Sequence, residues 1–174
     1  MFTENAVQAL VAFIDKFNRS IGRGVSIAVL LMTLVMFAVV VLRYGFSTGW
    51  IALQESVMYL HAMVFMLGAA YTLADDGHVR VDIFYRRCSV RCKAIINIIG
   101  TLLLLFPTCI FILSMSWDYV VTSWRLLESS KEAGGLPLVF LLKSLIPTFC
   151  VLLMLQGLAE ILRHTQQLST NRDS

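Results

Sequence analysis

The chain contains four long runs of apolar residues that are almost free of charge. They cover about residues 25–42, 56–74, 94–117 and 138–162. As an α-helix, the eighteen uncharged residues of the first run span about 27 Å, close to the hydrocarbon thickness of a bilayer. Because lipid offers the backbone no hydrogen bonds, a crossing segment must satisfy them internally, as a helix does. We therefore expect an all-α membrane protein, with residues 1–174 forming one membrane domain of four transmembrane helices.

The composition supports the same fold class and excludes several functions. Only 14% of the residues are charged, against about 25% in an average soluble domain. The net charge of +3 is small, and the basic residues stand beside apolar runs, where they interact with lipid headgroups rather than nucleic acid. We therefore expect membrane lipids, and no nucleic acid, among the partners.

The segment before the first run, about residues 4–21, has a different pattern. Its apolar residues recur every three or four positions, as on one face of a helix, with polar residues on the other face: Val7, Leu10, Val11, Ile14, Phe17 and Ile21 against Asn5, Gln8, Asp15, Asn18 and Arg19. This predicts an amphipathic helix in the headgroup plane that turns into the membrane at 22–24. The alternative is that it extends the first transmembrane helix.

The distribution of basic residues predicts the orientation. Ten Lys and Arg residues lie in the N-terminal segment, the second loop and the tail, and four lie on the opposite side. The positive-inside rule then places both termini in the cytoplasm.

Lys143 and His61 fall inside the expected membrane spans. Lys143 lies near the outer end of the fourth span, where we expect it to contact Glu55. His61, in the second span, is expected to form a hydrogen bond between helices. The alternative for His61 is a haem ligand in the membrane anchor of a redox enzyme. Pro107 and Pro147 lie inside spans and are expected to bend their helices.

The sequence contains no motif that would support catalysis. No phosphate-binding GxxxxGK, GxSxG or HExxH motif is present. We expect no enzyme activity and no cofactor, and we identify no catalytic, substrate-binding or metal-ligating residue. In the second loop, Gly77 permits a turn, while Asp82 is expected to pair with a neighbouring arginine and His78 has no catalytic partner.

Several short motifs resemble a known family in their order and spacing. They are RYGF from Arg43, the pair Gln54-Glu55, LGAAYTLADDGHVRVD from Leu67 to Asp82, and GGLP from Gly134 to Pro137, followed by Lys143 and Pro147. Together they resemble the small membrane (Q) subunit of tripartite ATP-independent periplasmic (TRAP) transporters, the DctQ-like family. The matching positions are Arg43, Gln54, Glu55, Gly68, Gly77, His78, Arg80, Asp82, Gly134, Gly135, Pro137, Lys143 and Pro147.

The resemblance implies a non-catalytic scaffold in the bacterial inner membrane. Its partners would be a large elevator-type membrane (M) subunit and a periplasmic substrate-binding protein, in a sodium symport complex for organic anions. GGLP and His61 look most like the branch that transports 2-oxo acids. Candidate contacts to the partners are Trp50, Trp124, Arg125 and Glu128.

The sequence also departs from the family pattern and leaves alternatives open. Many relatives have two acids and then an arginine where this chain has Gln54, Glu55 and Met58, so their charged contacts are not transferred. A free-standing small transporter or channel is a further alternative. Small residues on two helices would suit either a partner or packing within the chain: Gly68, Ala69, Ala70, Gly157 and Ala159.

Overall fold

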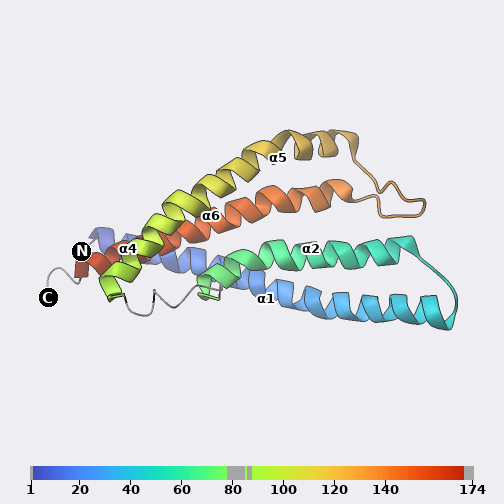
Figure 1. Ribbon diagram of the computed structural model, residues 1–174, viewed down its shortest axis with the longest axis horizontal. Helices are drawn as coiled ribbons and strands as arrows, with labels where there is room; N and C mark the ends of the chain where they lie inside the picture. The colour runs from blue at the N-terminus through green and yellow to red at the C-terminus, as the bar shows by residue number, and fades with distance from the viewer. Residues whose placement is uncertain (1, 78–84, 86–87, 171–174) are drawn as a thin grey trace.

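The computed structural model describes residues 2–77, 85 and 88–170, and its elements are all helices (Figure 1). They are α1 (Phe2–Gly45), α2 (Ile51–Ala74), α4 (Val90–Gly100), the π-helical turn η1 (Thr101–Leu105), α5 (Phe106–Leu126) and α6 (Val139–Thr170). Because α4, η1 and α5 follow one another without a gap, the described residues form four rods. Each is long and apolar enough to cross a membrane, which confirms the predicted fold class.

The four rods pack as neighbouring antiparallel helices. In the wider half of Figure 1 the order is α5, α6, α2 and α1, and at the other end α1 crosses toward α6. The start of α1 and the end of α6 lie at that second end, which we call the terminal end. The opposite loop end holds residues 46–50 and 127–138. The buried residues between the rods include a cluster of Ala70, Cys109, Cys150, Leu152 and Leu153.

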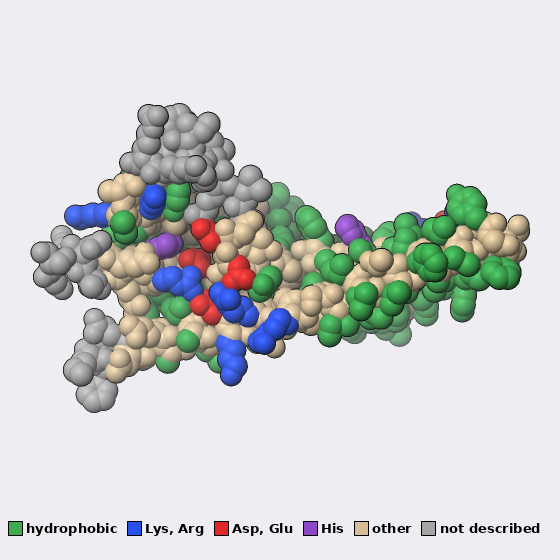
Figure 2. Space-filling view, turned by 90° about the horizontal axis from the view of Figure 1, so that it is seen from below, with side chains coloured by type: hydrophobic (Ala, Val, Ile, Leu, Met, Phe, Trp, Pro, Cys, Tyr) green, Lys and Arg blue, Asp and Glu red, His purple; other side chains and the backbone are tan. Residues whose placement is uncertain are grey.

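Charged and apolar side chains are separated along the bundle. On the face shown in Figure 2, most of the Lys, Arg, Asp and Glu side chains gather toward the terminal end. Hydrophobic side chains cover the opposite part of that face. This distribution is expected of a bundle whose loop-end half is surrounded by lipid or by other apolar protein.

The predicted turn at 22–24 is wrong, because α1 is continuous from Phe2 to Gly45. Two residues assigned to the solvent-facing side of the amphipathic segment instead face α6. Asn18 is 1% exposed and donates a hydrogen bond to Gln156, while Asp15 pairs with Arg163. The polar face of α1 around these two residues therefore packs on polar side chains of α6. Because it has this protein surface to contact, the helix continues into the bundle without a turn.

The observed helices overlap the predicted runs, and each extends beyond its run at one end or both. The prediction of 94–117, for example, lies inside a rod that runs from Val90 to Leu126. At its start, the Ser89 side chain accepts a hydrogen bond from the Cys92 N–H at 3.2 Å and so caps α4. At its end, Leu127 adopts a left-handed conformation (φ 45°) that terminates α5. These polar ends of the helices lie outside the uncharged runs and carry no hydropathy signal.

The irregularity expected at Pro107 takes the form of a π-helical turn. Proline lacks an N–H and its ring crowds the carbonyl four residues earlier. The wider turn η1 comes immediately before it, and the Phe106 N–H donates to the Thr101 carbonyl, five residues back. Pro147 lies inside α6, which continues on both sides of it.

The small residues of α2 and α6 pack within the chain. Ala70 and Ala159 are almost completely buried. A Cβ on Gly157 would lie 2.9 Å from Phe106 Cε1 and 3.0 Å from Thr101 Cγ2. Gly68 faces Val25 of α1. Of the two readings of these residues, internal packing is the one that the structure supports.

Candidate functional site

At the loop end, the GGLP segment folds over the Glu55 carboxylate. Glu55 Oε1 accepts a hydrogen bond from the Ser130 hydroxyl, and Oε2 accepts one from the Leu136 N–H at 2.6 Å. Gly134 has φ +82°, a conformation that favours glycine. A Cβ on Gly135 would lie 2.5 Å from Ser130 Oγ and 2.8 Å from Glu55 Oε2. The two glycines thus let the connection between α5 and α6 close on α2.

Replacing Gly135 with alanine should therefore release this connection from α2. The added methyl group cannot coexist with both hydrogen bonds to Glu55, and we expect a loss of about 1–3 kcal/mol in the free energy of unfolding. Thermal unfolding in detergent measures the loss. Gly49→Ala is the matched control, because a Cβ there meets nothing within 4 Å. Equal stability of the two variants would contradict the role given to Gly135.

Lys143 pairs with Glu128, so the predicted contact with Glu55 is wrong. The Lys143 ammonium donates to the Glu128 carboxylate and lies 3.7 Å from the centroid of the Tyr119 ring. Glu55 is occupied by Ser130 and the Leu136 N–H. The left-handed residue Leu127 turns the chain so that the next residue, Glu128, faces α6.

The ion pair at Glu128 should make the loop end sensitive to acid. The hydrogen bond from Lys143 holds the pKa of the Glu128 carboxyl below its ordinary value. Because the folded pKa is lowered, this stabilisation is present above the unfolded pKa of about 4.3 and is lost as pH falls through the folded pKa.

Replacing Glu128 with glutamine should remove this acid sensitivity. Unfolding midpoints of wild type and Glu128→Gln, measured between pH 7 and pH 3, should converge toward the acid end. A constant difference across the range would contradict the assignment, and Glu132→Gln, an exposed acid in the same loop, serves as the control.

The candidate contact residues at the loop end differ in their surroundings. Trp124 Nε1 donates to Ser144 Oγ at 2.6 Å, and its ring meets Phe140 edge-on with centroids 4.8 Å apart. Trp50 and Arg125 are exposed. Trp124 thus holds α5 against α6, whereas Trp50 and Arg125 are open to a partner.

A second polar cluster, at the terminal end, joins α1 to α6. Gln156 is completely buried; it accepts from Asn18 Nδ2 at 2.7 Å and donates to Asp15 Oδ1 at 3.0 Å. Arg163 donates to Asp15 Oδ2 at 2.6 Å and also pairs with Glu160. Our sequence analysis did not identify this cluster. Its one available signal was the spacing of Gln156, Glu160, Arg163 and His164, which places all four on one face of α6.

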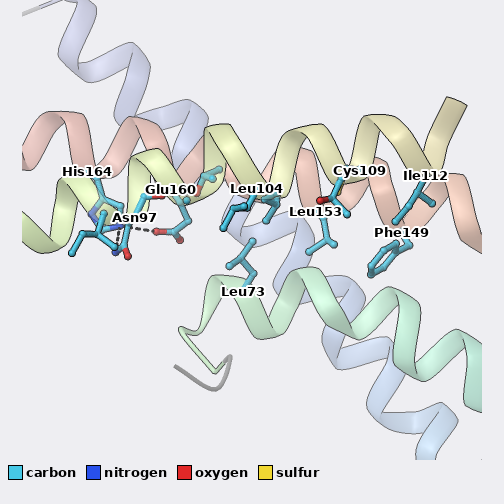
Figure 3. Close-up of a pocket in the computed structure, with 14 residues that line it drawn as sticks. Leu73, Asn97, Leu104, Cys109, Ile112, Phe149, Leu153, Glu160 and His164 are labelled. Carbon is cyan, nitrogen blue, oxygen red and sulfur yellow. Dashed lines mark hydrogen bonds and ion pairs between the residues drawn. The ribbon is translucent and has the colours of Figure 1, made fainter. Parts of the chain in front are cut away.

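The same cluster continues to α4, and a second ion pair reaches α2. The Asn97 amide lies 3.0 Å from His164 Nε2, as the dashed contact in Figure 3 shows. Arg19 pairs with Asp75 at 2.6 Å, which ties α1 to the end of α2.

The turn after α2 closes through the Gly77 N–H, which donates to the Thr72 carbonyl at 2.8 Å. The motif residues His78, Arg80 and Asp82 lie outside the described residues.

Several grooves open on the described part of the bundle surface. The first, about 630 Å³, lies between α2, α6 and the rod of α4, η1 and α5, and its apolar wall ends at Asn97, Glu160 and His164 (Figure 3). The second, about 690 Å³, lies between α1 and α2 and contains three of the predicted positions, Arg43, Gln54 and His61.

The surroundings of His61 do not resemble a haem site. Its ring stacks on Phe65 with centroids 6.4 Å apart. His164 lies at the terminal end in contact with Asn97, so the described residues bring no second histidine to His61. Within the same residues, no group of three His, Cys, Asp or Glu side chains converges on a metal position.

Taken together, the polar side chains of both clusters hold helices to one another. Each charged residue that reaches between helices is paired inside the chain: Glu55, Lys143, Asp15 and Arg163. Such an arrangement fixes the relative positions of the four rods.

Comparison with known proteins identifies the family. A family model described as tripartite ATP-independent periplasmic transporters, DctQ component, matches residues 32–167. A protein of Haemophilus influenzae assigned as a TRAP transporter small permease is 32% identical over 87 residues, which are 50% of this chain and 53% of that protein. The chain thus spans about half the length of this curated relative. No solved structure matches the chain.

The family match covers the loop-end features that the structure explains. The matched region contains Glu55 with its two hydrogen-bond donors, the two glycines of the GGLP segment, and the ion pair of Lys143 with Glu128. The match extends over much more than half of the sequence. The chain therefore belongs to the DctQ-component family of tripartite ATP-independent periplasmic transporters.

Proposed function

We propose that this chain is a rigid scaffold for a large membrane subunit, which carries an organic anion across the bacterial inner membrane in symport with sodium. The observation that carries the proposal is the internal pairing of the charged residues between helices, together with the apolar exterior. A subunit whose polar groups tie its own helices together has little left to line a solute pathway. It is well suited to provide a fixed surface against which another subunit moves.

The remaining partner in this proposal is a periplasmic binding protein that delivers the substrate. Trp50 and Arg125 are exposed at the loop end, which the distribution of basic residues assigns to the periplasm. A carboxylate is the expected substrate class, with 2-oxo acids as the first to test. Reporter fusions check the orientation: a fluorescent protein at the C-terminus should fluoresce, and alkaline phosphatase there should stay inactive.

Transport by proteoliposomes tests the proposal. Vesicles that contain the large subunit and this chain, supplied with the binding protein and a sodium gradient, should accumulate a labelled 2-oxo acid. Omitting this chain, the binding protein or the gradient should each abolish uptake. Uptake by this chain alone would favour the free-standing transporter, and full uptake without it would contradict the scaffold role.

A further inference from the structure

The groove between α1 and α2 carries polar groups that the chain itself does not satisfy. Arg43, at the end of α1, and His61, in α2, are exposed, and Gln54 is half-buried between them along the groove. Among the described residues none of these three side chains takes part in a hydrogen bond or ion pair; His61 only stacks on Phe65. This contrasts with Glu55, one residue from Gln54, whose two oxygens both accept hydrogen bonds.

Unpaired polar groups at this position are costly if lipid covers them. His61 follows Gln54 by seven residues, which places it about 10 Å further along α2. A histidine or glutamine at that depth is normally hydrogen-bonded or faces another helix. Apart from Thr33, whose hydroxyl donates to the Val29 carbonyl, the rest of the groove is lined by apolar side chains. They include Met32, Met36 and Met58, and the last two are more than half exposed. Flexible methionines adapt well to the surface of a partner helix.

We propose that this groove receives a transmembrane helix of the large membrane subunit, and that this helix carries a carboxylate or amide oxygen toward His61 and Gln54. This inference rests on the proposed function. The three groove residues offer chiefly N–H donors, and the groove has no acidic side chain of its own, so the complementary group is an acceptor.

A phospholipid fits the groove less well than a helix. Its phosphate could meet Arg43, which lies at the end of α1, but its acyl chain has no polar atom at the depth of His61. A helix can place an apolar surface on the methionines and an acceptor side chain at His61 at the same time. The small residues of α2 and α6 do not offer a competing surface, because they are used in packing within the chain.

Site-specific photo-crosslinking tests the location. The tagged chain, coexpressed with the large subunit, carries benzoyl-phenylalanine in place of Met58 in one preparation and in place of Phe111 in the other. Phe111 lies on α5 and is 63% exposed, against 54% for Met58. We expect at least about ten-fold more adduct with the large subunit at Met58. Phospholipid adducts alone at Met58, or equal adducts at the two positions, would overturn the proposal.

Co-purification separates this proposal from the proposed function. Wild type that fails to retain the large subunit would contradict the proposed function itself. If wild type retains it, the double variant Gln54→Leu/His61→Leu should lower the retained amount about ten-fold, since it removes two hydrogen bonds between helices. The control Ser114→Leu removes an exposed hydroxyl of α5 and should retain the wild-type amount. Undiminished retention by the double variant, or an equal loss in the control, would overturn the groove assignment.

Discussion

Alanine at Gly22 should destabilise the bundle, whereas alanine at Gly24, two residues further along α1, should not. A Cβ on Gly22 would lie 2.4 Å from Cγ and 2.8 Å from Cβ of Tyr71, while a Cβ on Gly24 would meet nothing within 4 Å. Because the Tyr71 Cβ moves only with its backbone, α1 and α2 must separate to admit the methyl group. Such overpacking costs about 1–3 kcal/mol.

Helix propensity acts in the same direction in both variants and offsets only part of the overpacking at Gly22. Alanine is favoured over glycine inside a helix by up to about 1 kcal/mol, so Gly24→Ala should match or exceed the wild-type stability. The fraction of each variant that remains monodisperse after heating in detergent measures its stability relative to wild type. If Gly22→Ala were as stable as Gly24→Ala, the close crossing of α1 and α2 would be wrong.

The second large effect is expected at the buried amide of Gln156. Replacing it with leucine removes the partner of Asn18, which is 1% exposed, and one of the donors to Asp15. A buried polar group without a partner costs about 1–3 kcal/mol. We expect Gln156→Leu and Asn18→Leu each to lower the free energy of unfolding by an amount in this range.

The double variant Asn18→Leu/Gln156→Leu should cost clearly less than the sum of the single variants. When both members of a buried pair become apolar, neither is left unsatisfied. Gln8→Leu, at an exposed position of α1, is the control and should change the stability by no more than about 0.5 kcal/mol. Strict additivity would show that the contact between α1 and α6 does not stabilise the fold.

The transmembrane helices could be predicted because a long uncharged run has few alternatives to a membrane helix. The path of the first segment could not, for a specific reason. The pattern around Asp15 and Asn18 shows that one helical face is polar, but not whether that face meets water or a polar helix such as α6. Only Gln156 and Arg163, more than a hundred residues later, decide between the two.

The partner of Lys143 was beyond sequence reasoning for a related reason. Glu55, Asp118 and Glu128 all lie near the loop end, and the choice depends on the conformation of residues 127–138. The left-handed conformation of Leu127 orients Glu128 toward Lys143. The glycines of the GGLP segment allow Ser130 and the Leu136 N–H to approach Glu55, which accepts a hydrogen bond from each. Loop geometry of this kind does not follow from hydropathy or charge.

The central claim is that this chain works as a stoichiometric partner of a large membrane subunit. Native mass spectrometry of the C-terminally tagged chain, extracted in mild detergent after coexpression with that subunit, tests it most directly. We predict one dominant species that contains one copy of each. A chain that emerges alone and monodisperse, or bound to a haem-containing protein, would contradict the account.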